Sequence, residues 1–336
     1  MNTPPLDARL RLGLIGAGAI AQSYVQALKD HPLARLHAVV DLRQQAAESV
    51  ADTCQCRAFT DVHEMLHAED LDGAIICTPP ATHTDVCTVL LAHGLHVLCE
   101  KPLAINTDAA ERMIDAARQH HRLLTMASKF RFVDDVVQAR ALVNSGLIGD
   151  IVLFENAFTA HVAMSERWNA CAEISGGGVL IDNGTHSVDI MRYFLGPLAE
   201  LQVIEGKRIQ DLEVEDTVRM FVRTESGIMG SIDLSWSINK ELPSYISIYG
   251  SQGTIQVGWK QSQYKRSQDA EWTVFGNGYD KLAAFRGQIT NFVEAIRGEH
   301  PPRVTPEDAL ASVQVVEAAY DALRASQWQP VVGQWN

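Results

Sequence analysis

Two side chains that can hold and move a proton, Asp182 and His186, lie four residues apart in the second half of the chain. If residues 179–194 form a helix, this spacing brings both side chains to one face, one turn apart. A carboxylate in that position can orient the imidazole, and an imidazole exchanges a proton near neutral pH. Asp189, three residues after His186, could fill the orienting role instead or anchor the helix against a neighbour. The pattern predicts general acid–base chemistry on this helix.

A glycine-rich turn near the amino end is suited to a phosphate group. A short buried strand, a tight turn and the start of a helix are predicted by the run Leu12-Gly13-Leu14-Ile15-Gly16-Ala17-Gly18-Ala19-Ile20-Ala21. Gly16 permits the turn and Gly18 lets the backbone approach a pyrophosphate, whose charge the first amides of the helix would meet. Ala21 takes the close-packing position. Small residues also end many ordinary strands, so the surroundings must support this interpretation.

The surroundings are those of a parallel sheet, because apolar runs alternate with helical patterns through the first half of the chain. The strand Leu36–Val40 ends at Asp41, 23 residues after Gly18. A carboxylate there suits a ribose 2'-hydroxyl and repels a 2'-phosphate, which favours NAD over NADP. Arg43 could partly offset that repulsion. The alternative role for Asp41 is a helix N-cap.

Two more strands are predicted to end at the same edge of the sheet. After Gly73–Cys77, the segment Thr78-Pro79-Pro80-Ala81-Thr82-His83 leaves the ladder, because proline cannot continue it. His83 could contact cofactor or substrate, or could begin the helix over residues 84–93. After His96–Cys99, Pro102 keeps Lys101 out of helical geometry, so the lysine side chain can project over this edge. The alternative is a surface lysine at a strand end.

Several of these motifs together resemble one protein family. GAGAIA, CTPPATH and Glu100-Lys101-Pro102, in this order and spacing, are similar to the glucose-fructose oxidoreductase and inositol dehydrogenase family, also called Gfo/Idh/MocA. The segment from Gly176 to Asp189 resembles the second signature of that family, and Ile248 to Thr254 resembles its late strand-turn-strand. The resemblance covers nearly the whole chain, and several ordered motifs are more specific than any one of them.

The resemblance implies an α/β amino-terminal Rossmann domain with a parallel sheet, and a carboxy-terminal α+β domain with an open, mostly antiparallel sheet. We place them at residues 1–128 and 129–336, with a sixth strand over residues 121–127 closing the first. The pattern of the second domain predicts a helix over residues 133–145, a last helix over residues 306–325, and strands at Ile151–Ala160, Ala199–Glu205, Asp216–Arg223, Met229–Trp236, Tyr245–Tyr249 and Thr254–Val257. The exposed face of an open sheet is expected to be covered by another subunit, so we expect a homodimer or homotetramer.

The resemblance also implies the chemistry. In this family the residues that match Lys101, Asp182 and His186 form the catalytic group of a dehydrogenase that uses NAD, with NADP as the alternative. His186 would act as general base on a secondary alcohol, and Lys101 would stabilise the developing alkoxide. The residues expected to contact the cofactor are Gly16, Gly18, Ala19, Ile20, Asp41, Arg43, Thr78, Pro79, His83, Glu100 and Lys101.

Substrates in this family are sugars, sugar derivatives, inositols and some other alcohols or ketones. Lys129 and Arg131 could hold a polyol or the acidic group of a sugar, although Arg131 matches a position that is often basic in the family and serves the structure. Lys129 is less usual there, so an anionic substrate group is one hypothesis. The residues expected to contact the substrate are Lys101, Lys129, Arg131, Trp168, Asn169, Asp182, Asn183 and His186.

Two other classes of function remain open. His63-Glu64-Met65-Leu66-His67 matches the HExxH pattern of zinc enzymes, whose two imidazoles share a helix face. The segment lies in a short crossover helix between two strands, so we interpret it as a solvated face with Met65 and Leu66 buried, and we expect no metal. The other class is a noncatalytic sensor of sugars or dinucleotides with this fold, which would not need to keep Lys101 and His186.

Length, composition and cysteine spacing limit the classes of protein and of binding partner. The 336 residues suggest two domains. The chain has 28 Lys and Arg against 41 Asp and Glu, a formal net charge of −13, which opposes binding to nucleic acid or an anionic membrane. No apolar run approaches the about 20 residues of a membrane span, and Met1 to Arg11 lacks the apolar core of a secretory signal. Six cysteines without a CxxC pair fit reduced packing residues in the cytoplasm, with Cys54-x-Cys56 as a metal fragment the alternative.

Overall fold

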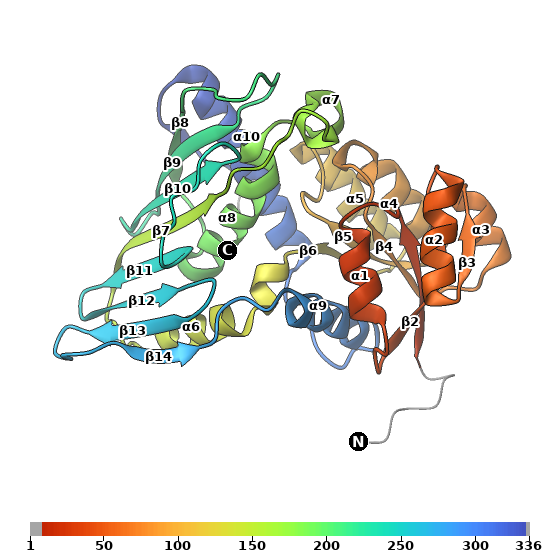
Figure 1. Ribbon diagram of the computed structural model, residues 1–336, viewed down its shortest axis with the longest axis horizontal. Coiled ribbons are helices and arrows are strands. Elements are labelled where there is room, and N and C mark those ends of the chain that lie inside the picture. Colours follow the sequence, from red (N-terminus) through yellow and green to blue (C-terminus); the bar gives the residue numbers. More distant parts are fainter. Residues whose placement is uncertain (1–8, 334–336) are drawn as a thin grey trace. The chain divides into compact units, whose positions relative to one another are not determined.

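The chain forms two units in the computed structural model, which describes residues 9–333 (Figure 1). Within these residues, the first unit contains residues 9–129 together with Lys281–Ala309, and the second contains Phe130–Asp280 and residues 310–333. The division proposed from sequence gave everything after residue 128 to one domain, whereas the packing groups residues 281–309 with the first unit. The periodicity of a helix does not show which core its apolar side will join.

The first unit has a six-stranded parallel sheet. Its order is β3-β2-β1-β4-β5-β6, with the bounds β1 Leu10–Ile15, β2 Ala34–Val40, β3 Arg57–Phe59, β4 Gly73–Ile76, β5 His96–Glu100 and β6 Leu124–Ala127. The direction of strand succession reverses between β1 and β4, which is the position where open α/β sheets bind ligands at their carboxyl edge. The predicted Rossmann architecture is confirmed.

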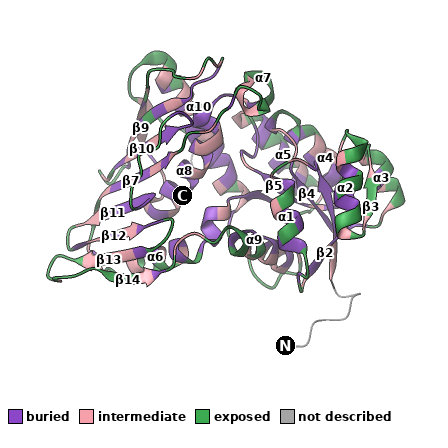
Figure 2. Cartoon of the chain, in the orientation of Figure 1, coloured by how far each residue is buried: buried purple, intermediate pink, exposed green. Residues whose placement is uncertain are grey.

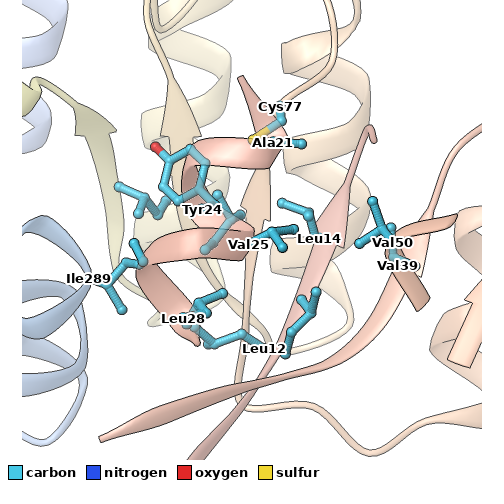
Figure 3. Close-up of a cluster of buried hydrophobic side chains, with 14 of the residues drawn as sticks. Leu12, Leu14, Ala21, Tyr24, Val25, Leu28, Val39, Val50, Cys77 and Ile289 are labelled. Carbon is cyan, nitrogen blue, oxygen red and sulfur yellow. The ribbon is translucent and has the colours of Figure 1, made fainter. Parts of the chain in front are cut away.

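Helices enclose this sheet and complete its core. They are α1 Ala21–Leu28, α2 Gln44–Cys54, α3 Val62–Ala68, α4 His83–Ala92, which follows the short 3-10 helix η2 Pro80–Thr82, α5 Thr107–Gln119 and α9 Lys281–Ile296. Side chains of β1, β2, α1, α2 and α9 meet in one buried cluster (Figure 3), and buried residues follow the strands of this sheet (Figure 2). Phe285 of α9 packs edge to face on Tyr24 of α1, with ring centroids 4.9 Å apart. α9 was not predicted from the sequence.

The second unit has a nine-stranded mixed sheet in the order β14-β13-β12-β11-β7-β10-β9-β8-β15. Its strands are β7 Ile151–Thr159, β8 Glu200–Glu205, β9 Thr217–Arg223, β10 Met229–Ser235, β11 Ile246–Gly250, β12 Gly253–Val257, β13 Ser262–Arg266, β14 Thr273–Gly276 and β15 Gln329–Pro330. Within the described residues of this second sheet, β7 and β10 form the one parallel pair, and the other pairs are antiparallel. The predicted mostly antiparallel sheet is confirmed, and β13, β14 and β15 were not foreseen.

Helices lie against one face of this sheet. α6 Asp134–Asn144 packs against β12 and β14, and α8 Val179–Leu195 packs against β7, β9 and β10. The second unit also contains the short α7 Ala172–Ser175 and most of α10 Pro306–Ala325. Phe154 of β7 packs on Phe194 of α8 at 5.6 Å between ring centroids. On β9, residues of the helix-covered face are buried and those between them are more exposed, as the two-residue period of a strand requires. No helix within residues 9–333 is long and apolar enough to cross a membrane.

Candidate active site

The glycine turn between β1 and α1 leaves room for a ligand. Gly16 has φ +97°, and a Cβ there would lie 2.9 Å from the Cys77 carbonyl group, so only glycine fits. Gly18 differs, because a Cβ at Gly18 would meet no described atom within 4 Å. Among the described residues, none provides a side-chain cap for α1, which begins after Ile20. The turn therefore fits the dinucleotide that its pattern predicts, with backbone amides available at the helix start.

Asp41 lies beside this turn, at the carboxyl end of β2. Its carboxylate accepts hydrogen bonds from the Ala17 amide at 2.8 Å, the Arg43 amide at 2.9 Å and the Arg43 Nε at 3.1 Å. Burial alone would raise the pKa of Asp41, and the hydrogen bonds from Arg43 and Ala17 outweigh it, so the pKa lies below its ordinary value. Asp41 is ionised at neutral pH. The residue at the N-cap of α2 is Arg43, so the alternative role of Asp41 as that cap is wrong.

His83, an expected cofactor contact, is completely buried in the first unit. Its Nδ1 lies 2.9 Å from the Pro102 carbonyl oxygen, and its Nε2 lies 2.9 Å from the Thr78 carbonyl oxygen. Burial lowers the pKa of His83. The imidazole thus links the turn after β4 to the turn after β5, which carries Lys101. This corrects the expected role, because backbone carbonyls occupy both ring nitrogens and the ring has no exposed surface for a ligand.

Glu100 is also directed into the first unit. Its Oε1 accepts a hydrogen bond from the Tyr24 hydroxyl at 2.8 Å, and its Oε2 accepts one from the Lys101 amide at 3.1 Å. Gln288 of α9 donates to the Tyr24 hydroxyl at 2.9 Å. Burial raises the pKa of Glu100, while the positive charges of Lys101 and Lys129 act in the opposite direction. A buried chain of side chains therefore fixes the backbone of the half-buried Lys101.

The expected proton-transfer pair lies on α8 in the second unit. Asp182, Asn183 and His186 are half-buried and lie in the first half of α8, where the residues around them are buried; Tyr193 and Leu195 near its end are half-buried as well. His186 meets Phe130 edge to face, with ring centroids 5.2 Å apart. The predicted helix is confirmed, and with it the spacing of one turn between Asp182 and His186.

Arg131 and Asp189 form a buried ion pair in the second unit. Arg131 Nε lies 3.0 Å from each carboxylate oxygen of Asp189, and Arg131 Nη2 lies 2.8 Å from Oδ1. The guanidinium also lies over the Tyr193 ring, at 5.3 Å from its centroid. Such multiple contacts hold both groups firmly. The structure therefore assigns Arg131 to the interior rather than to the substrate, and Asp189 anchors α8 against a neighbour, one of its two expected roles.

The other expected substrate contacts lie in different places. Lys129 belongs to the first unit, where its ammonium lies 5.9 Å from the centre of the Phe285 ring. Trp168 and Asn169 belong to the 3-10 helix η4 Trp168–Ala170 in the second unit, and the Trp168 side chain is exposed. No contact of Trp168 or Asn169 places them beside His186, so their role stays a prediction.

An aromatic cluster beside His186 was not foreseen. Its members are in ring contact with one another and come from distant parts of the second unit: Phe130, Phe158, Tyr245, Trp259 and Tyr279. Trp259 is 44% exposed, although its ring packs at a tilt on that of Tyr245, with centroids 4.4 Å apart. No local sequence pattern relates these residues, because only the fold brings them together.

The HExxH segment forms α3, the crossover between β3 and β4. His63, Glu64 and His67 are exposed, while Met65 is fully buried. Asp61 caps this helix by accepting the Glu64 amide at 2.9 Å. No group of three or more potential metal ligands gathers in the part of the chain that the structure describes. The interpretation as a solvated helix face over a buried Met65 is confirmed, while Leu66 is half-buried rather than buried.

Comparison with known proteins places the chain in a family. The pattern described as "Oxidoreductase family, NAD-binding Rossmann fold" (GFO/IDH/MocA) matches residues 10–128, and that of the GFO/IDH/MocA C-terminal domain matches residues 136–256. The rhizopine catabolism protein MocA of Rhizobium meliloti is 28% identical over 94% of this chain and 95% of its own. The myo-inositol 2-dehydrogenase of Thermotoga maritima is 25% identical over 96% and 100%.

A solved structure shows the same fold. Levoglucosan dehydrogenase, in a complex with NADH and levoglucosan, superposes with a TM-score of 0.90 over 97% of this chain and all of its own, at 19% sequence identity. The two family patterns cover both halves of the chain, and the glycine turn, Asp41 and α8 lie where those patterns match. The protein is therefore a member of the GFO/IDH/MocA oxidoreductase family, and its first unit is an NAD-binding Rossmann domain.

Proposed function

We propose that this enzyme interconverts a secondary alcohol and a ketone on a sugar, a sugar derivative or an inositol, with NAD as its cofactor. The observation that carries the proposal is the open glycine turn beside an ionised Asp41, in a chain that also presents Asp182 and His186 on one helix. The relatives named as dehydrogenases of inositol support the substrate class.

The proposed chemistry needs three side chains. When bound, oxidised NAD supplies a hydride acceptor at its nicotinamide ring. We propose that His186 takes the hydroxyl proton while the carbon-bound hydrogen leaves as hydride, so that the alcohol becomes a carbonyl. Asp182 orients the imidazole, and Lys101 donates a hydrogen bond that stabilises the alkoxide. The family motifs support the proposal that Lys101 acts in the same reaction as Asp182 and His186.

A substrate panel tests this proposal. Neutral sugars, inositols, uronates and sugar phosphates are each incubated with NAD and with NADP, and reduced nicotinamide is followed by its absorbance. We expect turnover with a neutral sugar or an inositol, or with an acidic sugar. No turnover of any compound, together with measurable NAD binding, would favour the noncatalytic sensor.

The same panel decides whether the substrate is anionic. Arg131 is engaged by Asp189, so Lys129 is the remaining cation of the two that the sequence suggested. One relative is a glucose-6-phosphate 3-dehydrogenase from Bacillus subtilis, 27% identical over 66% of this chain. If uronates and sugar phosphates all fail while neutral inositols react, Lys129 has no anionic substrate group to bind.

Asp41 should control the choice of cofactor. We expect Asp41→Ser to lower the ratio of kcat/KM with NAD to that with NADP by at least about tenfold, the effect of about 1.4 kcal/mol. The substitution removes the charge that repels a 2'-phosphate, and it releases Arg43, whose side chain is 71% exposed. Steady-state kinetics measures kcat/KM with NAD and with NADP for the variant and the wild type. Asp52→Ser, on the exposed side of α2, is the control. An unchanged ratio in Asp41→Ser would contradict this role.

The open face of the nine-stranded sheet supports a homodimer or homotetramer. The face away from α8 carries Phe221, together with Ile204 and Met229, which are 52% and 54% exposed. Apolar groups on a broad sheet face are usually covered by another surface. We expect the wild type to sediment as an oligomer at micromolar concentration and Phe221→Glu/Met229→Glu to sediment as a monomer. A monomeric wild type would contradict the proposal.

The cysteines support a cytoplasmic location for the proposed enzyme. All six are free in the structure, and Cys77, Cys87 and Cys99 are buried in the first unit. Burial raises the pKa of each of these three thiols, so they remain protonated packing residues. Such a set of unpaired thiols is typical of a reducing compartment.

A further inference from the structure

The start of α8 is held by one residue from outside the helix. Glu215 precedes β9, and its Oε1 accepts hydrogen bonds from the Gly178 amide at 3.1 Å and the Leu180 amide at 3.0 Å. The Glu215 carbonyl oxygen accepts the Val179 amide at 3.0 Å. Gly178, at the N-cap of α8, has no side chain to offer. Glu215 therefore supplies the acceptors that an N-cap residue normally supplies, and its carboxylate faces the positive end of the helix dipole.

A tyrosine completes this arrangement. The Tyr320 hydroxyl of α10 donates to Glu215 Oε1 at 2.8 Å and lies 3.2 Å from the Gly178 amide nitrogen. Both side chains belong to the second unit, and Glu215 is 5% exposed. Burial raises the pKa of Glu215, while the hydrogen bonds from Tyr320 and from the amides of Leu180 and Gly178 act in the opposite direction. Three donors converge on Oε1, so this oxygen acts as the acceptor that holds the helix start.

The glycine run before α8 is explained by the same pair. A Cβ at Gly177 would collide with the Tyr320 hydroxyl, and a Cβ at Gly178 would collide with the Glu215 backbone and approach its carboxyl carbon to 2.9 Å. The collisions involve the Glu215 backbone and the end of the half-buried Tyr320 ring, which cannot move aside as a flexible chain end could. Glycine at these positions therefore serves the approach of Glu215 and Tyr320 to the helix start.

We infer that Glu215, together with Tyr320, is a positioning residue for the reaction, because it fixes the first turn of the helix that carries Asp182 and His186. This inference rests on the proposed function. Each residue of an α-helix is rotated by about 100° from the previous one. If the first turn of α8 shifted by one residue, the side chains of Asp182 and His186 would therefore point in a different direction. Asp182 lies two residues after Leu180, within the turn that Glu215 holds.

The first test compares three variants of the full-length protein. We expect Glu215→Ala to lower kcat by about 10- to 100-fold, since misplacement of a reacting group by about 1 Å can cost that much. Kd for NAD should stay within about threefold, because the glycine turn belongs to the first unit. Glu215→Gln should recover most of the loss, because its amide oxygen can accept the same amides. Glu213→Gln, at an exposed position two residues away, should match the wild type.

A second measurement does not depend on turnover. Hydrogen exchange of a peptide covering residues 178–186 should be faster in Glu215→Ala than in the wild type, below the unfolding temperature of both, and near wild-type rates in Glu215→Gln. If the wild type turns over nothing on the panel but this exchange changes as expected, the proposed function fails and the control of α8 by Glu215 stands. If Glu215→Ala does not fold, Tyr320→Phe removes one hydroxyl and should shift kcat and exchange in the same direction.

Two results would overturn the inference. One is exchange over residues 178–186 that stays at the wild-type rate in a folded Glu215→Ala protein. The other is a loss of kcat no larger than the unfolded fraction of the variant predicts, which would leave Glu215 a purely structural role.

Discussion

We expect His186→Ala to lower kcat at neutral pH by about 100- to 10,000-fold, the range that positioned proton transfer contributes. The substitution removes the proposed base, a half-buried side chain of α8, and leaves the glycine turn of the first unit unchanged. Kd for NAD should therefore stay within about threefold of the wild-type value. The rate of reduction of bound NAD in a single turnover, followed by absorbance, measures the loss directly.

His67→Ala is the matched control for this prediction. His67 is an exposed histidine of α3, in the HExxH segment, and its loss should leave kcat unchanged. Turnover by His186→Ala at the wild-type rate would reject the assigned base. Stoichiometric zinc in the purified protein that disappears in His67→Ala would instead revive the zinc enzyme.

We expect Lys101→Met to lower kcat by about 100- to 1,000-fold, the usual cost of removing one donor to a developing oxyanion. Methionine keeps much of the side-chain length and apolar packing but cannot donate a hydrogen bond. The Lys101 backbone should remain in place, because its amide is bound by Glu100 and the Pro102 carbonyl lies beside His83. Steady-state kinetics with the best substrate of the panel, together with Kd for NAD, tests the prediction.

Lys29→Met controls for the loss of a positive charge from the first unit, since Lys29 is exposed at the end of α1. It should retain wild-type kcat. If Lys101→Met also retains it, Lys101 is not the oxyanion donor. If Lys101→Met and His186→Ala both lose turnover while both bind NAD, the enzyme is favoured over the sensor.

Much of the fold could be predicted because apolar residues recur along most of its helices and strands with the period of that structure. The helix expected over residues 179–194 is α8, one residue longer, and the helix expected over Pro306–Ala325 has these bounds as α10. β13 has the sequence SQYKR, which lacks the apolar alternation of a half-buried strand, so it was missed. α9 was missed as well, and its place in the first unit depends on tertiary contacts that its own sequence does not encode.

The candidate site could be predicted where a local motif fixes the position of its residues. Gly16, Gly18 and Asp41 are tied to a local strand-turn-helix, and their surroundings follow from that motif. A motif does not show which way a polar side chain faces. His83 and Glu100 were expected to contact the cofactor, but each is directed into the first unit, and Arg131 is buried against Asp189.

The partners of these buried groups are distant in sequence. Tyr24 lies 76 residues from Glu100, and Gln288 lies 264 residues from Tyr24. Glu215 and Tyr320, which hold the start of α8, are separated by 105 residues. No local pattern connects such pairs, because only the folded chain brings them within hydrogen-bonding distance.

The return of α9 to the first unit determines when that unit can be completed during synthesis. Phe285, Ile289, Phe292 and Val293 of α9 are at most 1% exposed and belong to the same apolar cluster as β1 and α1. While the ribosome is still making the second unit, α9 has not been synthesised, so the apolar side chains of β1 and α1 that pack on it remain exposed. A nascent chain stopped at residue 128 would expose apolar surface where α9 belongs, so the NAD-binding half is not an independent module that a single truncation can isolate.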